Sequence, residues 1–356
     1  MDIVYATRND ITNTMSIPPT THNKLLVDNK LRAASRSVEG RLHNRFYPEL
    51  KTVKFDWPNS QYAGTGRIWL DGNQVISVVT LTSGGVVVPA TNYYLRRSDD
   101  IDEPPYNYIE LDRSKSSVFS AGTTSQRAIA LTGLFGWNDT ATSVGAGLLG
   151  GNITAAVTTV VINPNLNEFN ISAGSLLLVG TERMVVIDSY MSSVGQNLAA
   201  DLTAVQGDKI VTVSNGAAFA GGETILIGAE RMRIDDIAGN NLIVSRAWDG
   251  TALSAHSLGA GSPIYALRTF TVARGVLGST AATHSSADVV YVHKFPDLVT
   301  ELTIAETIVM IEQASTGYAR IVGSGPNARE ATGKGLDDIR EQAMQIYGRR
   351  NRTAAI

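Results

Sequence analysis

The sequence contains no cysteine among its 356 residues. Disulfide bonds, thiolate catalysis and cysteine-ligated metal sites are therefore excluded, and stability has to come from burial and association. No stretch of about 18 uninterrupted apolar residues occurs, so we expect no transmembrane helix and no membrane partner. Residues 1–20 also lack the apolar core of a signal peptide, which favours synthesis in the cytoplasm.

Charge is also scarce. Charged residues make up 18% of the chain, and 30 Lys and Arg against 33 Asp and Glu leave a net charge of −3. A protein that grips nucleic acid concentrates Lys and Arg against the phosphates, so this balance argues against a dedicated DNA-binding role. A surface poor in charge fits a protein whose exterior is covered by neighbouring subunits. It fits an ordinary β-rich domain with a Thr, Ser and Gly surface equally well.

Helical periodicity is confined to the two ends of the chain. Thr7 and Asp10 form a capping-box pattern for a short first helix. A second helix should begin at Thr20 or Thr21 and run to Pro48. Its apolar residues recur at intervals of three and four on one face: Leu31, Ala34, Val38, Leu42 and Phe46.

The helical period returns near the C-terminus. Asp297 can cap a third helix that Gly317 would end, and Leu336 to Tyr347 mark a fourth amphipathic helix. We therefore predict that residues 1–48 and 296–356 form one helical domain assembled from both ends of the chain.

Between these ends the apolar residues alternate with a period of two, in short runs separated by Gly, Pro, Asn and Asp. Residues 49–138 are predicted to form one antiparallel β domain. Residues 139–151 are rich in Gly, Ala and Thr, which predicts a linker. The expected fold class is α+β: a discontinuous helical domain plus inserted antiparallel β domains, the second of which, over 152–295, contains a nested repeat.

The nested repeat is visible in two pairs of matching segments. GSLLLVGTERMVVID (174–188) matches GETILIGAERMRIDD (222–236), and VSRAWDGTALSAHS (244–257) matches VARGVLGSTAATHS (272–285). The first two segments lie farther apart than the last two, whereas tandem copies would give equal separations. The simplest order is one β unit, about residues 206–268, inserted at a hairpin tip of another.

Three residue types recur at equivalent positions of the two copies: Glu182 and Glu230, Arg274 and Arg246, His284 and His256. A repeated carboxylate could be catalytic, and a repeated histidine could bind a metal. Because all three types recur together with the fold signature, we interpret them as structural. The expected ion pairs are Glu182 with Arg274, and Glu230 with Arg246.

No other pattern in the sequence points to chemistry. Gly333-Lys334 lacks the earlier Gly and the following Ser or Thr of a phosphate loop, and no G-x-S-x-G nucleophile elbow occurs. We therefore predict no catalytic residue, no cofactor, no metal site and no enzymatic activity.

Four segments resemble landmarks of one known family. AASRSVEGRLHNRFYPE (33–49) is similar to the N-terminal signature of tailed-bacteriophage head-to-tail connector (adaptor) proteins. GRIWLDGNQVISVVTLTSGG (66–85), AIALTGLFGW (128–137) and the closing YGRR (347–350) look like later landmarks of the same family. The split repeat resembles β modules that are inserted into phage connector and tail proteins.

The resemblance implies a virion protein at the head-to-tail junction. It would form a ring, usually of twelve copies, docked beneath the portal protein, bound to a tail or stopper protein, with a central channel through which DNA passes. A C-terminal helix and tail would contact the portal, with candidate contacts at Tyr347, Arg349, Arg350 and Arg352. A mildly acidic subunit agrees with a channel that does not hold the passing DNA.

Two other interpretations stay open. The chain could be a different neck, collar or fibre-attachment protein of a virion, with the β modules as its binding platform. It could also be a carbohydrate-binding module, although aromatic residues make up only 7% of the chain.

Overall fold

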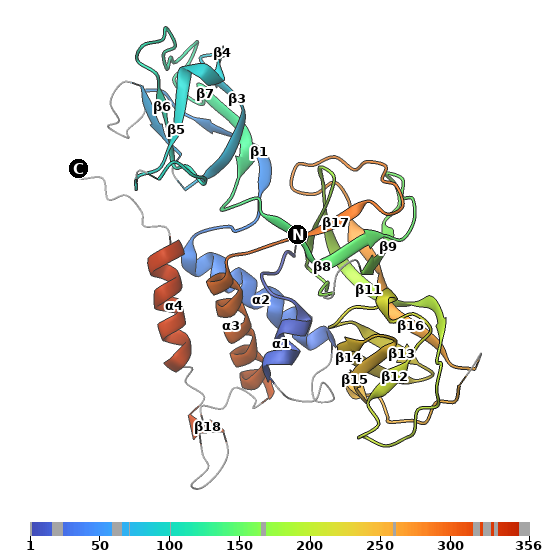
Figure 1. Ribbon diagram of the computed structural model, residues 1–356. Coiled ribbons are helices and arrows are strands. Elements are labelled where there is room, and N and C mark those ends of the chain that lie inside the picture. Colours follow the sequence, from blue (N-terminus) through green and yellow to red (C-terminus); the bar gives the residue numbers. More distant parts are fainter. Residues whose placement is uncertain are drawn as a thin grey trace. The chain divides into compact units, whose positions relative to one another are not determined.

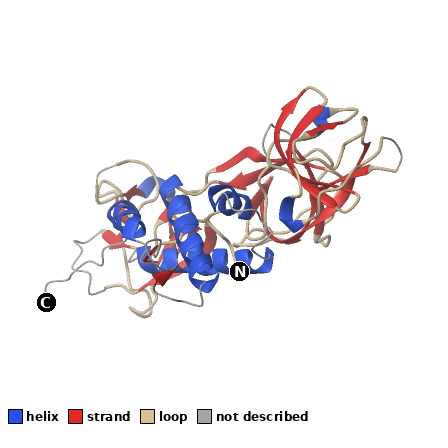
Figure 2. Ribbon diagram, turned by 90° about the horizontal axis from the view of Figure 1, so that it is seen from below, coloured by secondary structure: helices blue, strands red, loops and turns tan. Residues whose placement is uncertain are grey.

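The computed structural model describes residues 2–15, 24–58, 66–70, 72–99, 101–164, 169–258, 261–315, 321–322, 329–330 and 334–348. The fold is mixed α+β, with helices near both ends of the chain and the large sheets between them (Figure 1, Figure 2). Two compact units are present. Unit 1 comprises Met1–Val38, Ala141–Val276 and Thr280–Glu341, and unit 2 comprises Glu39–Thr140, Leu277–Ser279 and Gln342–Ile356. Within the described residues, no helix is long and apolar enough to cross a lipid bilayer.

The described part of the chain contains these α-helices: α1 (Arg8–Met15), α2 (Lys24–Leu42), α3 (Asp297–Ser315) and α4 (Lys334–Tyr347). The capping box before α1 is confirmed, since Thr7 N donates to Asp10 Oδ2 at 2.7 Å and Asp10 N donates to the Thr7 hydroxyl at 3.2 Å. The segments of α1, α2 and α3 share one buried apolar cluster of Val4, Ala6, Ile11, Val27, Leu31, Ile304 and Ile311. Helices from opposite ends of the sequence therefore cover each other's apolar faces.

The apolar face expected of the second helix is buried, at Leu31, Ala34, Val38, Leu42 and Phe46. The helix nevertheless ends well before Pro48. His43 has a φ of 50°, a left-handed conformation that stops the helical hydrogen-bond ladder. The expected start of this helix at Thr20 or Thr21, and the expected stop of α3 at Gly317, lie outside the described residues.

The large sheet of unit 1 consists of β8 (Ala141–Leu149), β9 (Thr159–Pro164), β10 (Leu176–Val179), β11 (Glu182–Asn197), β12 (Ile210–Thr212), β13 (Thr224–Ile227), β14 (Glu230–Ala238), β15 (Asn241–Ser245), β16 (Pro263–Ala273) and β17 (Val289–His293). Their order is β11-β10-β17-β8-β9-β16-β13-β14-β15-β12, and β11 also pairs with β16. That additional pairing closes the first six of these strands into a ring. A short hairpin of β18 (Ile321–Val322) and β19 (Arg329–Glu330) lies between α3 and α4.

Two modules share the long strands β11 and β16 (Figure 1). The outer module is defined as β8, β9, β10 and β17 with the first half of β11 and the second half of β16. The inner module is β12 to β15 with the remaining halves. Each module has its own buried core, around Phe270 in the outer module and around Ile234 in the inner one. The inner module closes the expected hairpin, with Ala238 opposite Asn241.

Residues 139–151 were expected to be a linker, but Ala141–Leu149 form β8, which pairs with β17 and β9. The pairing with β9 depends on Gly147, because a Cβ added there would collide with the carbonyl of Asn163. In the inner module the segment at the end of β11 takes the place that the end of β8 has in the outer module. Ala199 N donates to Thr212 O at 2.8 Å, as Gly150 N donates to Val161 O at 2.8 Å. The inner copy therefore begins before residue 206, near the end of β11.

Unit 2 contains two antiparallel sheets. One has the order β1-β7-β3-β4 and the other β2-β6-β5. The strands are β1 (Glu49–Phe55), β2 (Arg67–Trp69), β3 (Val75–Ser83), β4 (Val86–Val88), β5 (Tyr93–Arg96), β6 (Tyr108–Leu111) and β7 (Ile129–Phe135). Both sheets contribute to one buried core that includes Ile68, Leu81 and Leu131. This is the antiparallel β region expected from the alternating pattern.

The shared helical cluster leads to a first prediction. Ile311 of α3 is fully buried, and replacing it with Ala should lower the free energy of unfolding by about 2–5 kcal/mol through lost burial and an unfilled cavity. The measurement is urea denaturation followed by far-UV circular dichroism. Leu25→Ala on α2 is the control, because Leu25 is 62% exposed and its loss should change little. Equal effects of the two substitutions would contradict a core shared by both chain ends.

Candidate functional site

The expected pair of Glu230 and Arg246 forms the centre of a buried polar cluster in the inner module. Arg246 Nε donates to Glu230 Oε1 at 2.7 Å, and Nη2 donates to Oε2 at 2.9 Å. His256 Nε2 lies 2.9 Å from the same Oε2, and since an ionised carboxylate only accepts, Nε2 carries the proton. The backbone amides of Ala247 and Ser254 add hydrogen bonds of 3.0 and 3.1 Å. The carboxylate thus accepts from five donors.

The outer module repeats this cluster around Glu182. Arg274 donates to the two carboxylate oxygens at 2.7 and 2.8 Å, and His284 Nε2 lies 2.8 Å from Oε2. The amides of Gly275 and Ala282 each donate at 3.0 Å. The six residues singled out in the repeat therefore come together as two equivalent triads, and both expected ion pairs are present.

Each arginine also ties loops together through backbone carbonyls. Arg246 donates to the carbonyls of Thr203, Asp208 and Ser254. Arg274 donates to the equivalent set, the carbonyls of Thr154, Val157 and Ala282. One buried guanidinium therefore holds the loop before the second strand of its module and the loop after the repeated Arg. Each buried Glu–Arg–His cluster therefore joins these loops, at the same end of each module.

Electrostatics keep both carboxylates ionised. Burial raises the pKa of the Glu182 carboxyl, but hydrogen bonds from Arg274, His284 and two amides outweigh it, and the pKa falls from 4.5 to about 2. The Glu230 carboxyl behaves alike: burial raises its pKa, and the bonds from Arg246, His256 and two amides lower it to about 2. Because a carboxylate has about four lone-pair sites, neither group retains an open one for a substrate.

A second cluster lies at the end of α4 in unit 2. The ring of Tyr347 meets the ring of Phe46 edge-on at 5.9 Å between centroids, and that of Trp137 at 5.1 Å. Phe46 and Trp137 are 6.0 Å apart, so the three rings form one aromatic cluster. Asn44 Nδ2 donates to the carbonyl of Tyr347 at 3.3 Å. Tyr347, a candidate portal contact, thus anchors the last turn of α4, while Arg349, Arg350 and Arg352 lie outside the described residues.

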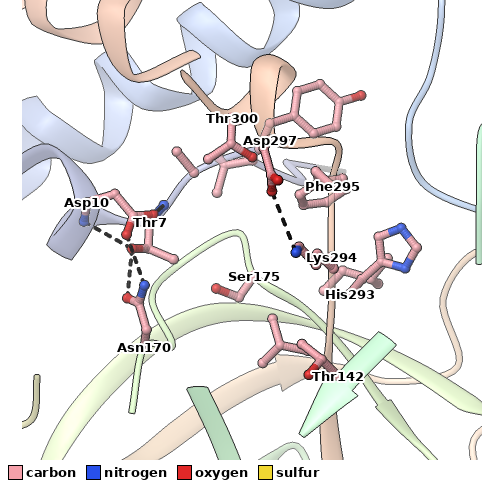
Figure 3. Close-up of a pocket in the computed structure, with 15 residues that line it drawn as sticks. Thr7, Asp10, Thr142, Asn170, Ser175, His293, Lys294, Phe295, Asp297 and Thr300 are labelled. Carbon is pink, nitrogen blue, oxygen red and sulfur yellow. Dashed lines mark hydrogen bonds and ion pairs between the residues drawn. The ribbon is translucent and has the colours of Figure 1, made fainter. Parts of the chain in front are cut away.

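Unit 1 also contains a pocket of about 400 Å³ next to the N-terminus of α3 (Figure 3). Its lining includes Ser175, the residue before β10, and Lys294, the residue after β17. Lys294 Nζ lies 3.6 Å from Asp297 Oδ1. On the opposite wall Asp10 accepts from the side-chain amide of Asn170 at 3.0 Å. Sequence analysis did not find this site.

Comparison with known proteins gives no relative. No protein-family model, curated protein or solved structure matches this chain.

A buried ion pair between Glu223 and Arg268 also escaped the sequence analysis. Arg268 donates to both carboxylate oxygens, at 2.8 and 2.9 Å. The pair belongs to the inner module alone, because Ser175 occupies the repeat position equivalent to Glu223. Repetition was the signal that revealed the other pairs, and it is missing here. Within the described residues, no group of three or more His, Cys, Asp and Glu side chains is placed to hold a metal ion.

The buried Glu–Arg–His cluster leads to a second prediction. Glu230→Gln keeps the size of the side chain but leaves the buried Arg246 without its counter-charge, which should cost about 3–5 kcal/mol and lower the melting temperature. Differential scanning calorimetry measures the change. Glu103→Gln, at an exposed loop position of unit 2, is the control and should leave the melting temperature unchanged. Equal melting temperatures for the two variants would rule out a structural role for the cluster.

The lowered pKa values lead to a third prediction. A carboxyl whose pKa falls from 4.5 in the unfolded chain to about 2 in the folded one stabilises the protein fully above pH 4.5 and loses this contribution as the pH falls towards 2. Each group contributes on the order of 3 kcal/mol at neutral pH. The gap in melting temperature between the wild type and Glu230→Gln should therefore shrink below pH 4.5. A gap that is constant from pH 7 to pH 3 would show that the group titrates normally.

Proposed function

We propose that this chain is a structural protein of a tailed-bacteriophage virion, a head-to-tail adaptor whose copies form a ring between the portal of the capsid and the tail. Its partners are further copies of itself, the portal protein and a tail or stopper protein. In the family it resembles, the ring usually has twelve copies. DNA passes through the central channel without sequence-specific binding. The proposal assigns the chain no catalytic role and no cofactor.

The aromatic cluster at the end of α4 carries this proposal. Three of the segments that resemble the adaptor family meet there: Phe46 belongs to the first, Trp137 to the third and Tyr347 to the closing YGRR. Edge-to-face aromatic contacts of this kind stabilise by about 0.5–1.5 kcal/mol each beyond the burial of their area. The contact holds the C-terminal end of α4, and the basic residues 349–352 follow it in the sequence.

The helical part of the proposal concerns the finer fold. We propose that the helices of both chain ends form one adaptor core from which the β regions are insertions. The apolar cluster shared by α1, α2 and α3 supports this. Leu25 on α2 and Ile346 on α4 are 62% and 61% exposed, and the proposal places them against a neighbouring copy in the ring.

Charge supports a channel that releases DNA. Non-specific binding to duplex DNA strengthens with each phosphate that the protein neutralises. Each such contact adds about −0.9 to the slope of log affinity against log salt concentration. A ring of strongly basic subunits would hold the moving genome. A subunit with a net charge of −3 would let it pass.

The docking role leads to a fourth prediction. Deleting residues 348–356 should weaken binding to the cognate portal about tenfold or more, because it removes the basic tail. Mass photometry of the protein mixed with portal measures both ring formation and docking. Tyr347→Ala should also weaken docking, since it removes both edge-on ring contacts that hold the end of α4. Tyr347→Phe is the matched control, because it retains the ring.

Two outcomes would overturn the proposal. A chain that stays monomeric in the presence of its portal is not a ring adaptor. Phage carrying the truncated chain that still yields DNA-filled, tailed particles in normal numbers would rule out the docking role of the tail.

A further inference from the structure

The two modules carry loops of the same backbone conformation directly after the repeated Arg. The inner loop is defined as residues 247–251 and the outer loop as residues 275–279. At the three positions where the backbone is left-handed, φ is 53°, 52° and 77° in the inner loop and 58°, 55° and 81° in the outer one. Asp249 of the inner loop is therefore equivalent to Leu277 of the outer loop, and Gly250 is equivalent to Gly278.

The outer loop covers the edge of a β-sheet. Leu50 lies on β1, an edge strand of the sheet β1-β7-β3-β4, and its N–H donates to the carbonyl of Leu277 at 2.8 Å. Gly278 lies so close to this strand that a Cβ added to it would be 2.2 Å from Leu50 O. The tip of the outer loop, Leu277–Ser279, therefore belongs to unit 2, together with the strand whose edge it covers.

The inner loop has the same shape, but its tip is exposed. Trp248 O accepts from Thr251 N at 3.2 Å, and Arg231 Nη1 donates to Asp249 Oδ2 at 3.1 Å, so contacts within the inner module hold the loop. None of the described residues donates to the carbonyl of Asp249, the counterpart of the Leu277 carbonyl. A loop that is already held in its binding conformation loses little entropy when it meets a partner.

The opposite edge of the same sheet is formed by β4, which pairs with β3 and with no other described strand (Figure 1). The turn between β3 and β4 has two glycines at positive φ, Gly84 and Gly85. The residues on either side of this turn form the hydrogen-bonded pair that closes it. The next pair, Thr82 with Val87, is therefore not hydrogen-bonded, and its backbone groups point away from each other. The N–H and C=O of Val87 thus point outward at the open edge.

The β4 edge lacks the charged side chains that protect an exposed strand. Proteins commonly place charges on edge strands, because these prevent pairing with other chains. β1 carries two lysines and one glutamate, whereas residues 72–95, which include β3 and β4, contain no charged residue. Val86 and Val87 are 70% and 61% exposed. An uncharged, apolar edge of this kind is open to contact with another chain.

We propose that the inner loop of one copy covers the β4 edge of a neighbouring copy, with the Asp249 carbonyl accepting a hydrogen bond from Val87 N–H. The contact repeats between two copies what Leu277 and Leu50 form within one chain. The occupant is a second copy, because this chain carries both the loop and the open edge, and an uncharged edge repels neither Asp249 nor Arg231.

The loop and the edge are different surfaces, so the contact is head-to-tail. Repeating a head-to-tail contact produces a ring when the rotation between copies closes. The inference rests on the proposed function, since it assigns the contact by which neighbouring copies of that ring bind each other.

Cysteine cross-linking tests the contact, because the chain has no cysteine of its own. Full chains with Asp249→Cys and full chains with Val87→Cys are mixed under oxidising conditions, with and without portal. Residues joined by a backbone hydrogen bond are close enough for a disulfide, so we expect a dimer with one chain of each variant. Asp249→Cys mixed with Lys54→Cys, an exposed position on the opposite edge strand, is the control and should give no dimer. Dimers of Val87→Cys alone, in place of the mixed dimer, would overturn the proposal, because β4 would then pair with β4.

Chains that carry both Asp249→Cys and Val87→Cys identify the occupant. On a non-reducing gel they should give a ladder of covalent oligomers. A cross-linked product that stays monomeric would overturn the proposal, because the loop would then cover the edge of its own chain. Copies that associate in mass photometry without a cross-link would refute this contact and leave the proposed ring standing. Copies that never associate, even with portal, would overturn the ring as well.

Val87→Pro tests the hydrogen bond itself. Proline removes the N–H of residue 87, which is not bonded to β3, and an edge strand tolerates proline at such a position. The substitution should raise the concentration for half-maximal assembly about fivefold or more, because each contact loses one hydrogen bond. Val87→Thr is the matched control, since it retains the N–H and should assemble as the wild type does. Equal assembly of the two variants would overturn the proposal, and if Val87→Pro does not fold, the cross-linked ladder decides.

Discussion

The fold of both modules depends on a buried carboxylate that accepts from an arginine, a histidine and two backbone amides. Taking a carboxylate and a guanidinium out of water costs several kcal/mol per ion, and the cost is offset only when every oxygen and every N–H finds a partner. Around Glu230 and Glu182 this condition is met, with five donors to each carboxylate. The loops that supply the amides and carbonyls are therefore fixed by the cluster.

This constraint explains why a module can be inserted into a copy of itself. The loops of each module are closed by its own Glu, Arg and His, so the opposite end can be opened without disturbing them. The long strands β11 and β16 pass from the outer module to the inner one at that opposite end, paired along most of their length. The hydrogen-bond ladder continues through the junction, and the inner module adds its own core around Ile234.

The sequence predicted the features that repeat and missed those that do not. The pairs of Glu182 with Arg274 and of Glu230 with Arg246 were predictable, because the same residue types recur at equivalent positions of both copies and two copies of one fold should place them alike. Glu223 has no repeated counterpart, so its pair with Arg268 and the pocket at Ser175 left no signal.

Predictions from local composition were wrong at positions where backbone contacts or backbone conformation determine the structure. Gly147 belongs to a stretch that resembles a linker, yet its missing side chain is what allows β9 to approach. Helix α2 ends before Pro48 because His43 has a left-handed backbone, which the apolar periodicity of the sequence does not predict. The aromatic cluster joins Phe46, Trp137 and Tyr347 from three distant segments, and only the order of the family landmarks hinted that they belong together.

The two modules differ at Glu223 and Arg268, whose buried ion pair belongs to the inner module. Each module has to keep its own buried Glu–Arg–His cluster, since the loss of either the Glu or the Arg leaves the other charge buried and unpaired. The Glu223–Arg268 pair is not kept in both modules: Ser175 stands where Glu223 stands, and it accepts from Ser172 N as Glu223 accepts from Ala220 N. The outer module therefore keeps its local backbone hydrogen bond at this place without a buried ion pair.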